Sequence, residues 1–250
     1  MAVGMSAPVR LEVQGRVGVL TLADAEGKNA LSHTLVDALL ARLQEAAAHE
    51  GIHALVLAGL PEVFCAGASR ELLLAIVDGT VSPSDILLSK AVLDLPVPVI
   101  AAMEGHAIGG GLALGLCADV VILSRESRYG ASFMNMGFTP GMGMTTLLEQ
   151  VMSPAQAQEL LLSGEARKGS DFVGAAGFNY ILPRRDVLPR AMAVAARIAE
   201  KPRRTLALLK RTLSVRRRQA FESTRTIEAL MHEISFAQVD IRQLVEDNYD

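Results

Sequence analysis

The chain has 250 residues, of which 50% are hydrophobic, 20% charged and only 4% aromatic, and its formal net charge is −3. This length can bury a sizeable core, and the absence of a basic excess argues against nucleic-acid binding. No uninterrupted apolar run reaches the roughly 18 residues of a membrane span, and two cysteines without metal-type spacing, Cys65 and Cys117, indicate a reducing, cytoplasmic setting and no metal site.

The first half of the chain alternates between strand and helix patterns. Short continuous apolar runs indicate strands that are buried on both faces, and apolar residues three and four apart indicate helices. Their alternation predicts βαβ units in a layered α/β fold. The expected elements, in chain order, are a β-hairpin of residues 9–12 and 17–22, a helix of residues 33–49 capped by Ser32, a strand of residues 54–58, a strand of residues 99–103, a helix from Gly109 to Cys117 and a strand of residues 120–124.

Helix patterns dominate the chain from Thr145 onward, and the only strand pattern there is a short one at residues 180–182. This shift in composition predicts an α/β core, residues 1–190, followed by a helical region, residues 191–250. The helices expected in this half cover residues 153–162, 186–200, 203–216 and 220–247.

Two glycine-containing loops follow buried strands, with the sequences FCAGA at residues 64–68 and GHAIGGG at residues 105–111. Small residues let backbone N–H groups point at a ligand without obstruction, and the second loop also opens a helix, where unpaired N–H groups favour negative charge. Three adjacent glycines are also typical of a tight packing point, and the spacing does not fit a dinucleotide fingerprint. Together the loops predict an oxyanion site, worth about 3–4 kcal/mol per donor in known enzymes.

These loops, with KNALS at residues 28–32, Ala118-Asp119 and GFTPGMG at residues 137–143, resemble the motifs of the enoyl-CoA hydratase/isomerase (crotonase) superfamily. The resemblance implies a spiral ββα core and a helical C-terminal region that covers the active site and forms a homotrimer. It also implies an acyl thioester substrate, carried on coenzyme A or on the phosphopantetheine of an acyl carrier protein, with no other cofactor. By position, it assigns the oxyanion donors to the N–H groups of Ala68 and Gly110, and a phosphate-side contact to Lys28.

Departures from the family pattern narrow the expected chemistry. Where hydratases of this family carry two glutamates, this chain has Ala113 and Phe133. Neither side chain can move a proton, and water addition needs a general base and a general acid. The chain instead looks like the decarboxylases of polyketide β-branching cassettes, carboxy-lyases that convert a 3-methylglutaconyl group on an acyl carrier protein into a 3-methylcrotonyl-type product, and Phe133 is then expected to contact the substrate.

His232 is the candidate proton donor. At helical spacing it falls off the main apolar stripe and lies on a second, partly apolar face. By pattern alone, such a histidine is more typical of a core residue, whereas the resemblance implies that it protonates the dienolate formed when carbon dioxide leaves. The main stripe contains Ile227, Leu230, Met231 and Ile234, and the second face contains Phe221, His232, Phe236 and Val239.

Close relatives carry a lysine that binds the departing carboxylate at the position of Ile76. The only cation in residues 69–89 is Arg70, which is typical of a surface residue but is the nearest candidate to replace that lysine. The run from Arg216 to Arg218 indicates a solvated helix face or a contact with an acidic carrier protein. Two alternatives stay open: an enoyl-thioester isomerase that uses His232 as its only acid and base, and a non-catalytic homologue that binds an acyl thioester.

Overall fold

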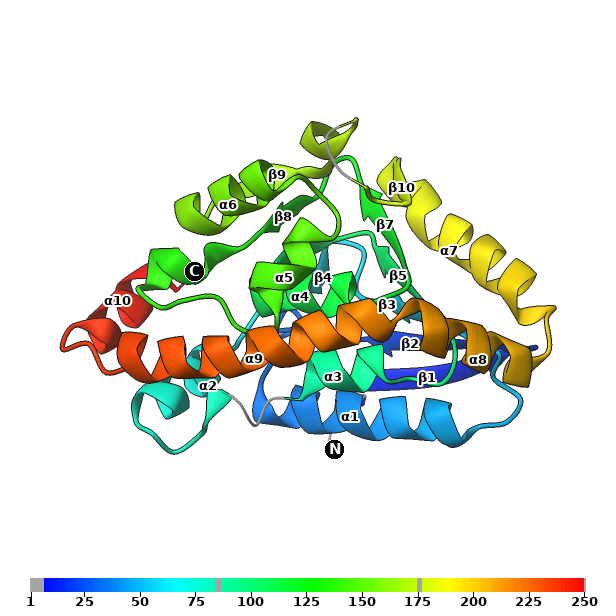
Figure 1. Ribbon diagram of the computed structural model, residues 1–250, viewed down its shortest axis with the longest axis horizontal. Coiled ribbons are helices and arrows are strands. Elements are labelled where there is room, and N and C mark those ends of the chain that lie inside the picture. The colour runs from blue at the N-terminus through cyan, green and yellow to red at the C-terminus, as the bar shows by residue number, and fades with distance from the viewer. Residues whose placement is uncertain (1–6, 84–86, 175–176, 250) are drawn as a thin grey trace, which may run out of the picture.

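The computed structural model describes residues 7–83, 87–174 and 177–249, and within them the strands form two sheets (Figure 1). Residues 1–6 and 250, at the two ends of the expected core and helical region, lie outside the described residues. In the larger sheet the first two strands are antiparallel and the others run parallel. Its strands, in spatial order, are β1 (Val9–Gln14), β2 (Val17–Leu22), β3 (Ala54–Ala58), β5 (Val99–Met103), β7 (Val120–Ser124) and β10 (Tyr180–Leu182).

The smaller sheet was not expected from the sequence, because its strands have only three residues each and are too short to show an alternating pattern. Its first three strands are parallel, and the fourth is antiparallel to the third. The strands, in spatial order, are β4 (Val63–Cys65), β6 (His106–Ile108), β8 (Arg128–Gly130) and β9 (Ala166–Lys168). Since β4 and β6 are neighbours and each leads into a glycine-containing loop, this sheet brings the two loops together.

The larger sheet is covered on both faces, which explains its continuous apolar strands. Alternate residues such as Val56 pack with α7 (Arg184–Ala199), and the residues between them, such as Leu57, belong to a second apolar cluster that includes α1. The buried residues of α7 recur every four positions, which places them on one helix face. The expected division at residue 190 falls inside α7, and buried residues from both halves of α7 pack on this sheet. Those residues are Val187, Ala191, Ala195 and Ala199.

The expected α/β class is confirmed, and helices lie near the expected positions. One helix prediction is wrong. A single helix was expected over residues 220–247, but the chain turns between α9 (Val215–Ser235) and α10 (Ile241–Asn248). Gln238 Nε2 holds this turn by donating to the carbonyls of Ser235 at 2.7 Å and Gly137 at 2.9 Å. The other helices are α1 (His33–Ala48), α2 (Arg70–Val77), α3 (Leu88–Leu93), α4 (Gly110–Leu116), α5 (Met144–Glu149), α6 (Pro154–Ser163) and α8 (Arg203–Leu213), with 3-10 turns η2 (Ser132–Met136) and η3 (Gly169–Phe172).

The turn after α9 sets the position of α10. α9 runs along one side of the molecule, and α10 packs against α2 and η2 (Figure 1). Tyr249, which follows α10, therefore reaches the first glycine-containing loop and donates to the carbonyl of Ala68. No helix in the described part of the chain is long and apolar enough to cross a membrane.

Candidate active site

The N–H group of Ala68 is oriented by the peptide to which it belongs. The N–H of Leu31 donates to the carbonyl of Gly67 at 2.7 Å. Because the C=O and N–H of one trans peptide point in opposite directions, this bond turns the Ala68 N–H away from Leu31. Gly67 has a φ of +95°, which glycine adopts without steric cost. A Cβ at this position would also lie only 2.9 Å from the carbonyl oxygen of Ile108, so the loop needs glycine here.

The N–H group of Gly110 points out of the N-terminal end of α4. Gly109 has a φ of +53°, and its carbonyl accepts the N–H of Ala113 at 3.1 Å as the first bond of the helix. The Gly110 N–H therefore has no acceptor inside the helix. Its nitrogen is 3.7 Å from the place of a Cβ on Gly67, so the two loops meet. Among the described residues, neither the Ala68 nor the Gly110 N–H donates a backbone hydrogen bond within the chain, which leaves both free for a ligand.

Asn29, in the KNALS motif, fixes the segment that orients Ala68. It is fully buried, and its side-chain nitrogen donates to the carbonyls of Leu22, Val63 and Phe64 at 3.2, 3.2 and 3.0 Å. Its side-chain oxygen accepts the N–H of Asp24 at 2.8 Å. These bonds tie the segment that leads to Leu31 onto β4, directly before the first oxyanion loop, which explains why the motif accompanies the loop in the sequence.

Ala68 and Gly110 line a cavity of about 370 Å³. Ile76 and Phe133 also line it, as expected, whereas Ala113 is completely buried and does not. None of the described residues that line the cavity is Asp, Glu, Lys or Arg, so it offers neither a carboxylate pair for water addition nor a cation. Its wall is mostly apolar, with the side chains of Leu73, Ile76, Ile108, Phe133, Met136, Phe138, Met142 and Phe236.

Four polar side chains line the same cavity and were not singled out by any sequence motif. They come from η2 and from the C-terminal end of α10, and no local pattern predicts that α10 folds back onto the oxyanion loop. These residues are Ser132, Asn135, Asn248 and Tyr249.

His232 reaches the cavity from α9 and is only 8% exposed. Its Nε2 lies 2.9 Å from the carbonyl oxygen of Thr139, and because a carbonyl can only accept, Nε2 carries a proton and Nδ1 is the nitrogen left to gain or lose one. Its ring packs edge-on against Phe236 at 5.5 Å. Burial lowers the pKa of His232, and hydrogen bonds to the carbonyls of Thr139 and Pro140 partly oppose this.

The two apolar faces of α9 differ in burial. The main stripe, with Ile234 at 77% exposure, faces outward, whereas the second face with His232 and Phe221 is buried. Val239 was expected on the same face as His232. This prediction is wrong, because Val239 is fully exposed in the turn after α9. His232 therefore lies in the interior, with Nε2 bonded to a backbone carbonyl and its ring at the wall of the cavity.

Glu228, one helical turn before His232, holds the turn of residues 137–143 against α9. It is 2% exposed, and its carboxylate accepts the N–H of Gly143 at 2.7 Å and the hydroxyl of Thr145 at 2.8 Å. Burial raises the pKa of Glu228, and these hydrogen bonds oppose that rise. The carbonyl of Thr139, which accepts from His232, belongs to the same turn. By holding this turn, Glu228 helps to fix the position of the imidazole ring.

Two expected substrate contacts lie away from the cavity. Lys28 is exposed beside Asn29 and does not line it. Arg70 opens α2 with its side chain 53% exposed and lies 3.8 Å from Glu246 of α10. The structure therefore brings together Ala68, Gly110, His232, Ile76 and Phe133, but not Lys28 or Arg70.

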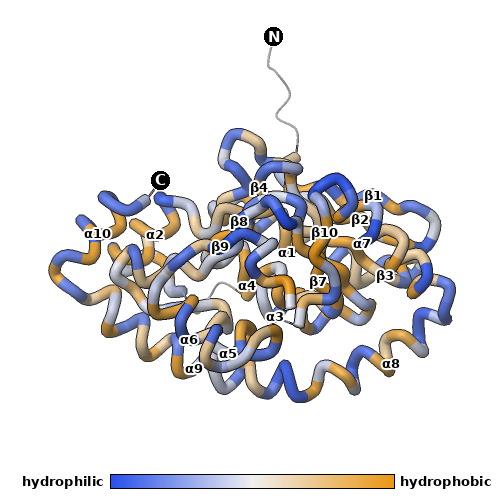
Figure 2. The backbone as a smooth tube through the Cα atoms, turned by 90° about the horizontal axis from the view of Figure 1, so that it is seen from above, coloured by the Kyte–Doolittle hydropathy of each residue, from blue (hydrophilic) through white to orange (hydrophobic). Residues whose placement is uncertain are grey.

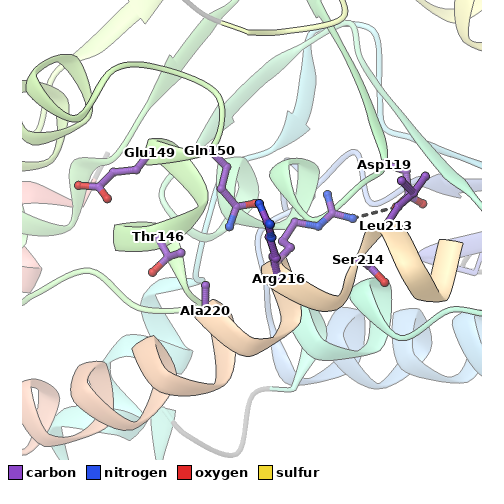
Figure 3. A pocket seen from close by; sticks show the side chains of 9 residues that line it. Asp119, Thr146, Glu149, Gln150, Leu213, Ser214, Arg216 and Ala220 are labelled. Atoms are coloured by element: carbon purple, nitrogen blue, oxygen red, sulfur yellow. Dashed lines mark hydrogen bonds and ion pairs between the residues drawn. The ribbon is translucent and has the colours of Figure 1, made fainter.

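The three arginines at the start of α9 have separate surroundings. Arg217 donates to Asp119 at 2.8 Å, and Arg218 lies 3.6 Å from Asp94. Arg216 and Arg217 line an open pocket between α5 and α9, which Figure 3 shows from close by. None of the three arginines lines the cavity that contains His232.

Among the described residues, no group of His, Cys, Asp and Glu side chains gathers in a way that could hold a metal ion.

Comparison with known proteins finds relatives that agree with one another on the family. A family model described as enoyl-CoA hydratase/isomerase matches residues 12–247. The bacillaene synthase decarboxylase PksI of Bacillus subtilis (strain 168) is 37% identical over 239 residues, which is 96% of each chain.

Two solved structures agree with this in shape as well as in sequence. A chain from a dehydratase/decarboxylase enzyme couple involved in polyketide β-branching superposes with a TM-score of 0.93 and 37% identity, over 97% of this chain and 99% of that chain. The ECH2 decarboxylase domain of CurF from Lyngbya majuscula superposes with a TM-score of 0.90 and 33% identity, over 98% of this chain and 100% of that chain.

Proposed function

This chain belongs to the enoyl-CoA hydratase/isomerase family, and on that premise we propose that it is a carboxy-lyase of polyketide β-branching. Its substrate is a 3-methylglutaconyl-type thioester, and its product is a 3-methylcrotonyl-type thioester. The observation that carries this proposal is the content of the cavity: two backbone N–H donors and one imidazole, with no carboxylate among the described lining residues. This set can stabilise an enolate and protonate it, but it cannot add water.

The reaction needs no external electron acceptor, because the conjugated thioester receives the electrons. The bond between the terminal carboxylate and its neighbouring carbon breaks, and carbon dioxide leaves. The electron pair of that bond moves into the thioester and gives a dienolate, whose negative oxygen accepts hydrogen bonds from the Ala68 and Gly110 N–H groups. His232 then delivers a proton to a dienolate carbon, which completes the product.

The apolar wall of the cavity is expected to favour loss of carbon dioxide by removing water from the substrate carboxylate. Ile76 and Phe133 line the cavity, and no Lys or Arg is among the described residues that do. A carboxylate held there loses much of its hydration without gaining an ion pair, while the charge in the transition state is spread into the thioester. Removal from water therefore destabilises the carboxylate more than the transition state and favours cleavage.

The substrate is proposed to arrive on the phosphopantetheine of an acyl carrier protein or on coenzyme A, and no other cofactor takes part. PksI is named as a decarboxylase of bacillaene synthase, and an acyl carrier protein is the carrier that we propose for this chain. A cytoplasmic setting is part of the same proposal and fits two cysteines that are both free thiols, Cys65 and Cys117.

A homotrimer is proposed through the outer faces of the helical region, residues 191–250. α8 and α9 lie at the edge of the molecule, with apolar segments along their length (Figure 2). Large exposed apolar residues in a contiguous stripe mark an interaction surface. A solution mass three times that of the chain supports this assembly, and a monomeric mass at micromolar concentration contradicts it. The exposed residues are Leu208, Leu209, Leu213, Ile227, Leu230 and Ile234.

The test is to incubate the protein with 3-methylglutaconyl-loaded acyl carrier protein and to follow the mass of the acyl group. A loss equal to the mass of carbon dioxide supports the carboxy-lyase. A gain equal to the mass of water would show a hydratase. An unchanged mass with a shifted double bond would show the isomerase alternative, and an unchanged acyl group would leave only a binding role.

The pH dependence is expected to follow His232. A proton donor must carry its extra proton, and burial lowers the pKa of His232 below its usual value of 6.5. We therefore expect kcat/KM, which reports the free enzyme, to fall as the pH rises through a midpoint below 6.5. The midpoint of kcat is expected at a higher pH, because the bound anion favours the imidazolium form. Profiles of both constants check this, and a flat kcat/KM profile between about pH 5 and 7 contradicts it.

Gly141→Ala is expected to lower kcat by up to about 10²-fold, because a Cβ at this position would lie 2.6 Å from Cε1 of His232 and must displace the imidazole ring. Gly177→Ala is the matched control, since its Cβ would lie at an ordinary 3.5 Å from the carbonyl oxygen of Val151. Steady-state kinetics and thermal unfolding of both variants make the comparison. A Gly141→Ala variant with the control's kcat would mean that the ring position does not limit turnover.

A further inference from the structure

Tyr249 places a phenol in the cavity directly beside the oxyanion loop. Its hydroxyl donates to the carbonyl oxygen of Ala68 at 3.0 Å, and the residue lines the cavity. It follows α10, which is held on α2 by an ion pair between Arg242 and Asp78. Ile76 lies on the same helix α2 and lines the same cavity. The phenol and Ile76 thus belong to two helical segments that pack on each other and line one cavity.

The other uncharged polar side chains that line the cavity contact residues other than Ala68. Asn135 donates to the carbonyl of Gly164 at 3.0 Å, and Asn248 donates to the carbonyl of Leu244 at 2.9 Å. Ser132 lies next to the second oxyanion loop, where its Oγ would be 3.7 Å from a Cβ on Gly109. Tyr249 is therefore the side-chain donor next to the Ala68 loop.

The phenol can exchange its present acceptor for a better one. Its O–H rotates about a single bond, and a carboxylate accepts a stronger, charge-assisted hydrogen bond than the neutral carbonyl of Ala68. Burial raises the pKa of Tyr249, so the hydroxyl keeps its proton throughout the neutral range. One such bond orients an anion while leaving its charge without a counter-ion, as cleavage in an apolar cavity requires.

We propose that Tyr249 is the residue that recognises the terminal carboxylate of the diacid acyl group in this cavity. The inference rests on the proposed carboxy-lyase function and deepens it. The phenol selects a diacid over a monoacid thioester and holds the scissile bond near the oxyanion donors. After carbon dioxide leaves, the hydroxyl returns to the Ala68 carbonyl, and the monoacid product loses this contact.

The test compares two inert thioesters that differ only by the carboxylate, glutaryl and butyryl, each on the carrier that the wild type accepts. The variant is Tyr249→Phe, which keeps the ring and removes the hydroxyl. The matched control is Tyr180→Phe in β10, where the ring packs with Arg190 at 4.2 Å. Tyr249→Phe is expected to weaken glutaryl binding by about 10- to 100-fold, the loss of a hydrogen bond to a charged group, and to leave butyryl binding unchanged.

Equal losses for the two thioesters would overturn the proposal, because Tyr249 would then only anchor the loop through Ala68. Unchanged binding of both would overturn it as well. Carbon dioxide release by the wild type is measured in the same preparation. Release without a selective effect of Tyr249→Phe refutes the recognition role alone, whereas a selective effect without release refutes the carboxy-lyase function alone.

Discussion

Replacing His232 with alanine is expected to lower kcat for carbon dioxide release by about 10²- to 10⁴-fold, the range that a positioned general acid contributes. His232 is the only histidine that lines the cavity among the described residues, and its Nε2 is fixed on the carbonyl of Thr139 at 2.9 Å. The variant keeps both oxyanion N–H groups, because these belong to the backbone of Ala68 and Gly110. We therefore expect substrate binding to change much less than kcat.

The matched control is His33→Ala, at the exposed first residue of α1. Single-turnover kinetics on the loaded carrier protein, with unfolding curves for both variants, separate a chemical from a structural effect. Wild-type turnover by a folded His232→Ala variant would remove His232 from the mechanism and would require another proton donor in the cavity.

Replacing Asp119 with alanine is expected to lower the free energy of unfolding by about 3–5 kcal/mol, because it leaves a buried charge without its partner. Lys210 has a side chain only 4% exposed, and its ammonium lies 2.9 Å from Asp119 and 2.9 Å from the carbonyl oxygen of Val97. The same carboxylate accepts the N–H of Val99 and a bond from Arg217, both at 2.8 Å. Asp119 thus joins α8 and α9 to the larger sheet.

The control for Asp119 is Asp94→Ala, which removes an equivalent carboxylate from exposed partners. Asp94 lies 2.7 Å from Lys90, and both side chains are about 40% exposed, at 39% and 42%. Such surface pairs contribute about 0–1 kcal/mol. Urea unfolding at one protein concentration measures both variants. A loss for Asp119→Ala no larger than for Asp94→Ala would contradict the role assigned to the buried network.

Much of the fold follows from patterns that the sequence displays. The strands of the larger sheet, such as Ala54–Ala58, are buried on both faces and therefore appear as uninterrupted apolar runs. The buried residues of α7 repeat every four positions and lie on one face. The strands of the smaller sheet escaped prediction because three residues, as in His106–Ile108, are too few to establish a period. Their pairing depends on contacts between distant parts of the chain.

The residues of the candidate site, too, could be predicted only in part. The resemblance assigns Ala68 and Gly110, but the orientation of the Ala68 N–H depends on Leu31, which contacts Gly67 from a different loop. On α9, the face with His232 is buried and the stripe with Ile234 faces outward, and the pattern of two apolar faces does not tell which of them packs on the core. No sequence pattern indicated that Tyr249 lines the cavity. Its place there depends on the turn between α9 and α10, which interrupts an otherwise helical pattern.

The terminal carboxylate is expected to leave as carbon dioxide, and an isotope label can follow that carbon atom. A 3-methylglutaconyl-loaded carrier protein with an isotope label in the terminal carboxyl group is incubated with the wild-type protein, and the released gas and the acyl group are analysed together. We expect one labelled carbon dioxide for each unlabelled 3-methylcrotonyl-type product. A label that stays in the acyl group, with folded enzyme and loaded carrier, would contradict it.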